Sequence, residues 1–480
     1  MQITNRLNEN LHTNNLNISE INNILFGLIS FIKLFAISEF KIMAIAKCRF
    51  SGQPLHKTFV DLGMSPLANA YLRAEQLNNA EKFYPLHAYI SEETLLVQLE
   101  QFETPDRIFS DYAYFSSYSV SWLKHAKDYT DMMVEKFGFN HHNQVIEIAS
   151  NDGYLLQYFL EKEIPVLGIE PAANIAKVAE SRGIPSINKF FGVETAKELV
   201  IQGKLADLLI GNNVLAHVPD LNDFIAGMKL ILKPNGILTM EFPHILQLIQ
   251  ENQFDTIYHE HFSYFSFLTI EKIFAAHNLQ IFDVEELPTH GGSLRIYAKH
   301  DYADNPSISD RVSHLKAKEI AAGLHRIETY ITFAEEVKQT KHKLLNFLLT
   351  AKAEGKSIAG YGAPAKGNTL LNYCGIGKDF IDYTVDCNPY KQGLFLPGTH
   401  IPIFEPDKIR ETKPDYVLIL PWNLKEEIME QMAFIGEWGG QFVVPIPEVK
   451  IYPCSIVVEE ECRMQNPEFR INQSEIQTCH

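Results

Sequence analysis

The chain has 480 residues, long enough for two or three domains with ordinary hydrophobic cores. Its 42 basic and 59 acidic side chains give a net charge of −17 without a lysine-rich or arginine-rich run, which argues against general binding to a nucleic acid backbone. Its six cysteines form no CxxC pair, a usage typical of reduced thiols in a cytoplasm.

The first 43 residues are predicted to be an extension outside the fold. Residues 24–37 are mostly apolar, but the run is shorter than a membrane-spanning helix requires and Lys33 interrupts it. Residues 1–20 are rich in asparagine and contain Arg6 as their one base, a composition unlike a secretory signal. Met43 offers an alternative start. We therefore expect no stable membrane insertion and a cytoplasmic location.

Residues 44–118 are predicted to form a small, loop-rich module. Short apolar pieces alternate with prolines at positions 54, 66, 85 and 105, and small modules of this kind often need a staple. The segment ends in a stretch containing Tyr112, Tyr114 and Tyr118, and such stretches more often pack in a core than perform chemistry. A helix is predicted to follow, to about Phe137.

Residues 144–171 predict a strand, a tight turn, a helix and a second strand. The apolar run 145–149 ends in a polar turn, a helical pattern follows, and a second apolar run stops at Glu170. Glu170 lies about 20 residues beyond the turn, the distance at which nucleotide folds place a carboxylate on ribose hydroxyls. Gly153 suits the turn because only a small residue lets the backbone approach a ligand closely.

The turn lacks the dinucleotide fingerprint G-x-G-x-x-G. Glu147 and the run Ser-Asn-Asp-Gly instead resemble the first motif of class I methyltransferases, which use S-adenosylmethionine, a cationic cofactor that a carboxylate such as Asp152 suits. Any βαβ unit with an acid at a strand end remains the alternative. The cofactor-binding residues that this resemblance implies are Glu147, Ala149, Ser150, Asn151, Asp152, Gly153, Glu170 and Pro171.

A third buried run, residues 206–211, is followed by polar residues. Open α/β sheets bind ligands at the carboxyl ends of their strands, so Asn212, Asn213 and His217 are expected to face the cleft, the two asparagines as cofactor-binding residues. A capping or core role for His217 is equally compatible with the sequence. A helix over 221–232, a turn at 233–236 and a strand over 237–241 are predicted next.

Residues 254–266, FDTIYHEHFSYFS, concentrate titratable side chains. A phenol, two imidazoles and a carboxylate lie within four residues, a cluster that favours catalysis over decoration beside a cofactor cleft. The motif Y-H-E-H-x-x-Y, with HGGSLRIY at 290–297, resembles the signature of the sugar C-methyltransferases, which act on nucleotide-linked 4-keto deoxysugars. The resemblance covers roughly residues 46–452.

This resemblance implies a reaction through an enolate. His261 is expected to be the general base and Glu260 to orient it. The resemblance further implies that Tyr258, Tyr112 and His217 bind the ketone or an adjacent hydroxyl, and that Tyr114 and Tyr264 contact the substrate. The enolate carbon would then displace the methyl group from the sulfonium, and positioning of the two reactants should supply much of the rate.

The amino-terminal module departs from this family at its zinc site. The family pattern places CxxC at both ends, whereas the four positions here hold Cys48, Ser51, Ser91 and Thr94. Hydroxyls are poor zinc ligands, and one cysteine cannot hold the metal. We therefore predict no zinc, with the module held by packing and Cys48 as a small buried hydrophobe.

The remaining chain is predicted to form a linker, a second lobe and a tail. Residues 306–350 predict amphipathic helices, and residues 351–453 predict parallel strands with helical crossovers, a second Rossmann-like lobe without the dinucleotide fingerprint. The resemblance implies that this lobe helps enclose the nucleotide sugar, with Lys366 and Lys391 as diphosphate partners. Residues 454–480 are predicted to be a polar tail.

The predicted architecture is therefore α/β, with a class I methyltransferase core at 119–305 between a small module and a second Rossmann-like lobe. The expected cofactor is S-adenosylmethionine and the expected partner is a small-molecule nucleotide sugar, bound by a monomer or homodimer. Three alternatives stay open. They are an O- or N-methyltransferase acting on a sugar or other small molecule, a non-catalytic nucleotide-binding or interaction protein, and a hydride-transferring oxidoreductase built on the second lobe.

Overall fold

The computed structural model describes residues 46–104, 116–118 and 120–453. The chain divides after Lys47, and the unit Cys48–His480 contains all the sheets described below. The predicted extension at 1–43, the residues Tyr112 and Tyr114, and the predicted tail at 454–480 lie outside the described residues.

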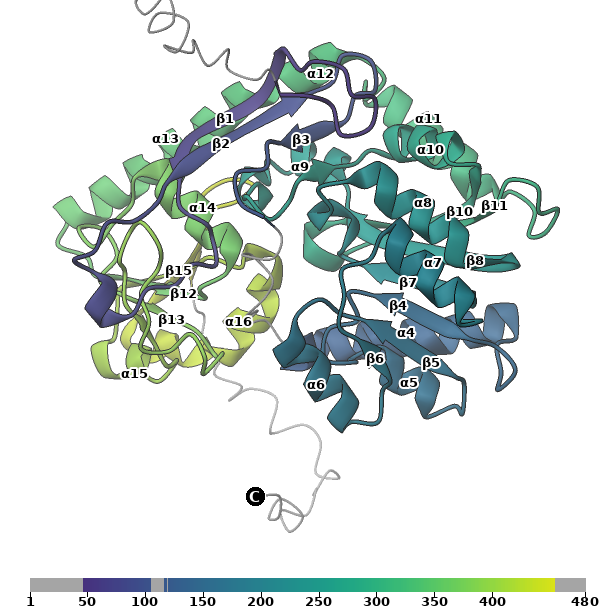
Figure 1. Ribbon diagram of the computed structural model, residues 1–480. Helices are drawn as coiled ribbons and strands as arrows, with labels where there is room; N and C mark the ends of the chain where they lie inside the picture. The colour runs from purple at the N-terminus through teal and green to yellow at the C-terminus, as the bar shows by residue number, and fades with distance from the viewer. Residues whose placement is uncertain (1–45, 105–115, 119, 454–480) are drawn as a thin grey trace, which may run out of the picture. The chain divides into compact units, whose positions relative to one another are not determined.

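The amino-terminal module is built on an antiparallel sheet. β1 (Lys57–Ser65), β2 (Tyr84–Ile90) and β3 (Val97–Leu99) pair in that order (Figure 1), and β9 (Ser263–Tyr264) adds to β3 from much later in the chain. The sequence did not predict these strands individually, and loops make up most of the module around them. The pairing of β1 with β2 contains two register shifts, which break the alternation of buried and exposed residues by which a strand is recognised.

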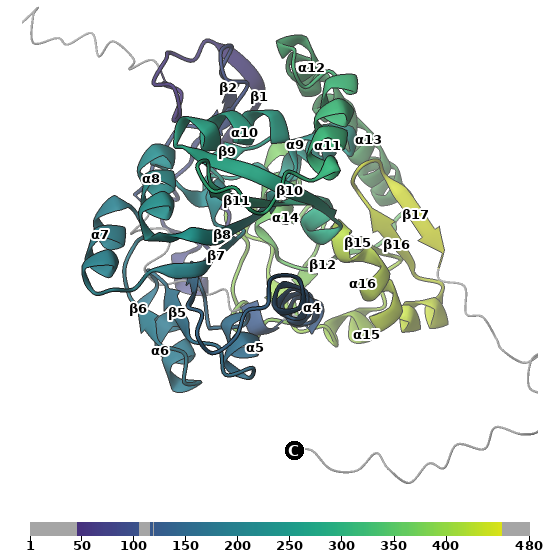
Figure 2. The ribbon, with the colours of Figure 1, turned by 90° about the vertical axis from the view of Figure 1, so that its right-hand side faces the viewer.

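The central lobe is built on a seven-stranded sheet in the order β10-β11-β8-β7-β4-β5-β6 (Figure 2). Its strands are β4 (Val145–Ile148), β5 (Val166–Ile169), β6 (Ser186–Ile187), β7 (Ala206–Asn212), β8 (Leu232–Pro243), β10 (Leu279–Leu287) and β11 (Ser293–His300). The pairs are parallel except β8–β11 and β10–β11. The predicted α/β class is confirmed, and the strand order reverses between β4 and β7, where such sheets bind ligands.

Helices and short turns connect these strands. They are η2 (Ser116–Tyr118), α4 (Val120–Phe137), α5 (Leu156–Leu160), α6 (Ala173–Ser181), α7 (Val193–Ile201), η3 (Leu215–His217), α8 (Leu221–Ile231), α9 (Ile245–Gln250), η4 (Phe254–Thr256), α10 (Phe267–Ala276) and η5 (Thr289–Gly291). Residues 233–236, predicted as a turn, lie within the bounds of β8 but form a register shift, since Leu232 pairs with Ala206 and Ile237 pairs with Leu208. A Cβ on Gly236 would lie 2.8 Å from the carbonyl oxygen of Ala206, so glycine lets β8 lie against β7 at a register shift.

The carboxyl-terminal lobe carries a six-stranded sheet in the order β14-β13-β12-β15-β16-β17, parallel except for β17. Its strands are β12 (Ile358–Tyr361), β13 (Thr384–Val385), β14 (Ile403–Phe404), β15 (Tyr416–Ile419), β16 (Gln441–Val444) and β17 (Lys450–Pro453). The helices that lead into this lobe and connect its strands are α11 (Asp310–Ala321), α12 (Ile327–Ile331), α13 (Phe333–Ala353), α14 (Ala365–Cys374), α15 (Lys408–Thr412), η6 (Trp422–Leu424), α16 (Lys425–Gln431) and η7 (Ala433–Trp438).

The amino-terminal sheet shares its hydrophobic core with the carboxyl-terminal lobe. Phe59 of β1 is fully buried and stacks on Phe333 of α13, with ring centroids 4.7 Å apart, while Tyr330 meets its edge at 6.3 Å. In Figure 1 these strands, in purple, lie beside α13, in green. Burying a phenylalanine side chain stabilises a fold by roughly 1.5–3 kcal/mol, so this packing helps to hold the module in place.

Among the described residues, no helix is long and apolar enough to cross a membrane. The apolar run at 24–37 lies outside them.

Candidate active site

The turn after β4 has an unusual backbone. Ala149, Asn151 and Gly153 have φ angles of 55°, 49° and 79°, in the left-handed region that non-glycine residues rarely adopt. A Cβ on Gly153 would lie 2.2 Å from Cδ1 of Ile184, so only glycine fits there. Strained backbone concentrated at the carboxyl end of a strand is typical of a ligand-binding turn.

Glu170, at the end of β5, is fixed against this turn. Its two carboxylate oxygens accept hydrogen bonds from the backbone amides of Asn151, at 3.0 Å, and Ala172, at 2.8 Å. Burial raises its pKa, and the two amide hydrogen bonds oppose that effect. The side chain of Asn188 donates to the carbonyl oxygens of Glu170 and Pro171, at 2.9 and 2.8 Å, which holds the chain at the strand end.

Asp152 and Glu147 lie within the same turn and strand. Asp152 is buried, and its Oδ2 accepts from Ser117 and pairs with Arg182 at 3.3 Å. Burial raises the pKa of Glu147 well above its ordinary range, with the charge of Glu170 adding to the effect and the Tyr154 hydroxyl opposing it. Burial and the neighbouring acids therefore favour the uncharged form of the Glu147 carboxyl.

Several buried polar atoms at the ends of β4 and β7 have no hydrogen-bond partner within the described part of the chain. They are Ser150 Oγ, Asp152 Oδ1, Asn212 Oδ1, Asn212 Nδ2 and Asn213 Oδ1. Native proteins rarely leave such atoms unpaired, so their concentration at the switch point indicates a polar ligand. These residues fit S-adenosylmethionine, with Asp152 as a carboxylate for its cationic part and Glu170 placed at the strand end for a ribose.

Two imidazoles lie together in the segments that follow β7 and η4. The rings of His217, in η3, and His261 have centroids 4.6 Å apart. The Nδ1 of His217 donates to the carbonyl oxygen of Glu260 at 2.8 Å, and the Nδ1 of His261 donates to the carbonyl oxygen of Thr256 at 2.9 Å. Because a carbonyl oxygen only accepts, the proton of each ring lies on Nδ1 and Nε2 is the basic nitrogen.

The Nε2 of His261 is paired with a phenol. Tyr258 donates its hydroxyl to this nitrogen at 2.8 Å, and the two rings lie 4.0 Å apart. Burial lowers the pKa of His261 well below its ordinary range, with the nearby His217, His290 and Lys366 adding to the effect, and lowers that of His217 to about 4. Both imidazoles are therefore uncharged at neutral pH, as a general base must be.

Glu260 does not orient His261, which corrects the role expected for it. Its carboxylate instead accepts two hydrogen bonds from the side-chain amide of Asn69, at 3.0 and 2.7 Å, and the Thr256 carbonyl holds His261. Burial raises the pKa of Glu260 to about 7. Asn69 and Thr256 were missed in the sequence because a hydrogen-bond partner from another segment, or a backbone carbonyl, leaves no local pattern.

Tyr264 lies beside the same cluster as a buried residue of β9. Its ring centroid is 6.1 Å from that of His261, and its backbone pairs with Val97 of β3. Burial raises the pKa of the Tyr264 hydroxyl well above its ordinary range, so the phenol stays protonated. Its role in substrate binding remains a prediction.

The carboxyl-terminal lobe places Lys366 close enough to the two imidazole-bearing segments to influence His261 and His290 electrostatically. Its ammonium donates to Oδ1 of Asn423 at 2.8 Å and lies 4.5 Å from the ring centroid of Trp422. Burial lowers the pKa of Lys366, and the charge of Asp255 opposes that effect.

Among the described residues, the Lys391 ammonium has more polar partners than the Lys366 ammonium. Its ammonium donates to the carbonyl oxygen of Ala363 at 2.9 Å, pairs with Asp386 at 3.5 Å and lies 5.5 Å from the ring centroid of Tyr71. The Tyr71 hydroxyl donates to the same Ala363 carbonyl at 2.6 Å and lies 3.3 Å from Oδ1 of Asn69. A continuous set of polar contacts thus joins the second lobe, the amino-terminal module and Glu260.

Family models match three consecutive parts of the chain. They describe a zinc-binding domain at residues 48–109, a methyltransferase domain at 122–284 and a C-methyltransferase C-terminal domain at 288–447. The protein named C-methyltransferase NovU, from Streptomyces niveus, is 35% identical over 410 residues, which cover 85% of this chain and 97% of that protein. This chain belongs to the C-methyltransferase family. It is a methyltransferase that depends on S-adenosylmethionine.

Other similarities cover only part of this C-methyltransferase. A ubiquinone biosynthesis O-methyltransferase of Chelativorans sp. (strain BNC1) is 27% identical over 96 residues, 20% of this chain and 38% of that protein. The crystal structure of PH0226 protein from Pyrococcus horikoshii OT3 has 15% identity and a TM-score of 0.33, covering 42% of this chain and 99% of that one. Neither similarity indicates the substrate of this chain.

The zinc-type site of this C-methyltransferase does not fit the metal. The Sγ of Cys48 lies 3.5 Å from Oγ1 of Thr94 and against the hydroxyl of Ser51, and the hydroxyl of Ser91 accepts from the Thr94 amide at 3.2 Å. The four positions therefore converge, but three neutral hydroxyls stand in the places of thiolates. Within residues 46–104, 116–118 and 120–453, no three His, Cys, Asp or Glu side chains are placed to hold a metal ion.

Arg49 holds the loop that carries Cys48 against the central lobe. Its guanidinium donates to the carbonyl oxygens of Pro219, at 2.6 Å, and Leu99, at 2.7 Å, and lies 4.8 Å from the ring centroid of Phe262. Its backbone amide donates to Oε1 of Gln98 at 2.8 Å. These bonds fix the loop in the way that a structural metal would otherwise do.

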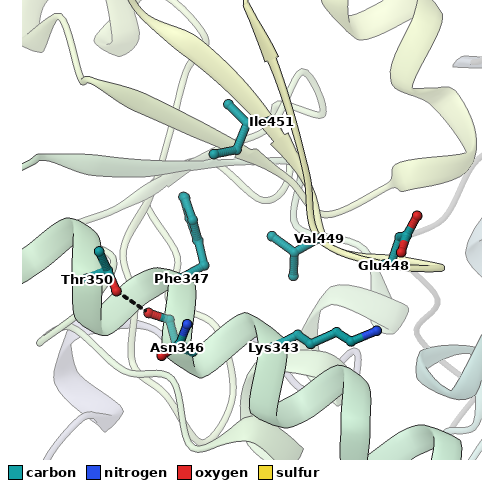
Figure 3. Close-up of a pocket in the computed structure, with 7 residues that line it drawn as sticks. All are labelled: Lys343, Asn346, Phe347, Thr350, Glu448, Val449 and Ile451. Atoms are coloured by element: carbon teal, nitrogen blue, oxygen red, sulfur yellow. Dashed lines mark hydrogen bonds between the residues drawn. The ribbon is translucent and has the colours of Figure 1, made fainter.

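A surface pocket of the C-methyltransferase lies apart from these residues, between α13 and the start of β17 (Figure 3). It is lined by Lys343, Asn346, Phe347, Thr350, Glu448, Val449 and Ile451. None of the predicted site residues lines it, so the pocket is separate from the candidate active site.

Proposed function

We propose that this enzyme methylates a carbon beside the ketone of a nucleotide-linked 4-keto-deoxysugar. The observation that carries the proposal is the buried pair of uncharged imidazoles, His217 and His261, with the Tyr258 phenol on the basic nitrogen of the second. A saturated carbon becomes nucleophilic only as an enolate, which needs a base for the proton and donors for the oxygen. This cluster contains both, a base in its imidazoles and a hydrogen-bond donor in the Tyr258 phenol.

The residues divide the work as follows. As substrate enters, the Tyr258 hydroxyl turns from His261 to the ketone oxygen, and Nε2 of His261 removes the proton from the neighbouring carbon. The electron pair of that C–H bond moves into the carbonyl group to give the enolate. His261 then carries both ring protons, and the Thr256 carbonyl continues to hold its Nδ1 proton.

When bound, S-adenosylmethionine supplies an electrophilic methyl group to the enolate carbon and departs as S-adenosylhomocysteine. The turn of Asn151, Asp152 and Gly153, with Glu170, Asn212 and Asn213, would hold it. The rate of methyl transfer would depend on how the cofactor is positioned, because two oriented reactants gain much of their rate from proximity.

The nucleotide part of the substrate is assigned to the second lobe. An ammonium has three donors, and Lys366 uses one of them on Asn423 within the described residues, whereas Lys391 is bonded to Ala363 and paired with Asp386. Lys366 is therefore the better diphosphate partner of the two. Tyr112, Tyr114 and Tyr264 remain proposed substrate contacts on the family resemblance alone.

The test is mass spectrometry of reactions containing the purified enzyme, S-adenosylmethionine and a panel of nucleotide 4-keto-6-deoxysugars, with and without a 3-amino group. A sugar nucleotide that gains one methyl group which base treatment cannot exchange would support the proposal, and NMR would locate the carbon. Methylation of an oxygen or nitrogen would instead support the O- or N-methyltransferase alternative. Absence of transfer to every sugar, with cofactor binding intact, would overturn the substrate class.

A further inference from the structure

His290 occupies a constrained turn beside the site. It lies in η5, between β10 and β11, with φ 55° and ψ 18°, and Gly291 and Gly292 follow with φ of 92° and 119°. A Cβ on Gly291 would lie 2.5 Å from Cη2 of Trp422 and 2.9 Å from Nε2 of Gln253. The turn therefore packs closely against the lobe that carries Lys366, and His290 has little freedom to move.

A second residue in the left-handed region faces His290. Asn213, with φ 52°, follows β7, and its Nδ2 donates to Nε2 of His290 at 2.9 Å. Its own backbone amide donates to the carbonyl oxygen of Glu241 at 2.7 Å, which fixes Asn213 to β8. Two strained residues that hold each other in place are typical of a functional site, where the surrounding fold maintains the strain.

The contact with Asn213 determines the tautomer of His290. Because Nε2 accepts a hydrogen bond, the ring proton lies on Nδ1. Within the described chain, the bond to Asn213 is the one hydrogen bond of this ring, so the Nδ1 proton has no protein acceptor. The ring packs at 5.1 Å from Trp122, and the side chain is only partly buried, so Nδ1 is accessible to a ligand.

The surroundings keep this imidazole uncharged. Burial lowers the pKa of His290 to about 4; the nearby Lys366, His125 and His217 add to that effect, and the nearby Glu241 opposes it. An uncharged imidazole carries one N–H proton. It can donate this proton in a hydrogen bond without transferring it to the substrate. His290 also influences His261 electrostatically, which places it among the groups that surround the proposed base.

We propose that His290 donates its Nδ1 proton in a hydrogen bond to the substrate oxygen that carries the developing enolate charge. This inference rests on the proposed function. Tyr258 and His290 would then be the two donors at that oxygen, one from the Y-H-E-H segment and one from the turn before β11. Asn213 is the positioning residue, since its amide holds the proton of His290 on the nitrogen that faces the ligand.

The test uses the full chain with a sugar nucleotide that the wild-type enzyme methylates. His290→Phe removes the donor and keeps a ring, while His290→Asn returns an amide donor near the position of Nδ1. Two rates are measured: methyl transfer, and exchange of the acidic carbon-bound proton with D2O in the presence of S-adenosylhomocysteine. His290→Phe should lower both by about 100-fold, the usual effect of removing one oxyanion donor, and His290→Asn should recover at least part of the loss.

The affinity for S-adenosylhomocysteine, measured by calorimetry, should stay within about twofold of wild type for both variants. The control is His314→Phe, at an exposed position of α11. His290→Phe activity within about threefold of wild type, or a parallel loss of cofactor affinity, would overturn the inference. If the variants do not fold, 15N NMR of the wild-type imidazoles decides the matter, because an Nε2 proton on His290 at neutral pH would refute the assigned donor. Failure of the wild type on every sugar is a different result, which refutes the proposed function.

Discussion

The side-chain amide of Asn69 donates to both carboxylate oxygens of Glu260, at 3.0 and 2.7 Å. This contact joins residues 191 positions apart, one in the amino-terminal module and one in the Y-H-E-H segment. The backbone of the same Glu260 accepts from His217, and the next residue is the proposed base. The module that the family model names for zinc therefore also supports the catalytic segment.

Asn69→Ala should destabilise the enzyme and disturb the catalytic segment. It leaves a buried carboxyl without its side-chain donor, a loss that typically costs about 1–3 kcal/mol of unfolding free energy. Urea unfolding measures this change, and Asn78→Ala, at an exposed position in the same module, is the control. Equal stability of the two variants would show that the Asn69–Glu260 contact contributes nothing to the fold.

Glu260 should make the stability depend on pH. Its pKa is about 7 in the folded protein, against 4.5 for an ordinary glutamate, so between these values the folded state holds a proton that the unfolded state has lost. The contribution of Glu260 is therefore complete below pH 4.5 and is lost as the pH rises through 7, by an amount on the order of 3 kcal/mol.

Glu260→Gln should remove this part of the pH dependence. The variant should gain stability relative to wild type as the pH rises from 5 to 8, which denaturant unfolding at several pH values measures directly. Glu180→Gln, at an exposed position of α6, should leave the dependence unchanged. A wild-type advantage that grows over this pH range would contradict the assignment.

His261→Ala should abolish turnover while sparing the cofactor. A positioned general base contributes about 100-fold to 10,000-fold, and His261 contacts Tyr258 and Thr256 rather than the cofactor turn. Steady-state methyl transfer and calorimetric titration with S-adenosylhomocysteine measure the two properties separately, with His314→Ala as the control. A comparable loss of cofactor affinity would mean that His261 has a structural role.

As the pH is lowered, kcat/KM should fall only below the pKa range of an ordinary histidine. Burial lowers the pKa of His217 to about 4 and that of His261 well below 6.5, so both bases stay uncharged as the pH falls through 6. We expect kcat/KM of the Glu260→Gln variant, which lacks the carboxyl that titrates near 7, to be nearly constant between pH 7 and 6. A fall in kcat/KM centred at pH 6.5 in that variant would mean that burial does not keep the base uncharged.

Metal removal should not affect the enzyme. Cys48 is the one thiol among the four converging positions, so elemental analysis of purified protein should find no stoichiometric zinc, and chelators should change neither activity nor melting temperature. The triple variant Ser51→Cys, Ser91→Cys and Thr94→Cys should acquire zinc and become sensitive to chelators. One zinc per chain in the wild type would refute this interpretation.

Local patterns in the sequence were enough to predict several strands and turns of the fold. Mostly apolar runs such as 145–149 and 206–211 predict buried parallel strands, and the turn that ends at Gly153 needs a residue without a Cβ. The Y-H-E-H motif pointed to the proposed catalytic segment for the same reason, since its titratable groups lie within four consecutive residues. Register shifts hid β1, because they break the period on which strand recognition depends.

Contacts between side chains far apart in the sequence depend on how the folded segments pack together, so no local pattern predicts them. Asn69 reaches Glu260, Asn213 reaches His290 and Lys366 approaches both imidazole-bearing segments because three parts of the chain pack together. The tertiary structure also assigned the orientation of His261 to the Thr256 carbonyl, a group that every residue possesses and that no sequence motif can mark. Burial then set the protonation states, because the loss of water around a side chain depends on the whole fold and not on its neighbours in sequence.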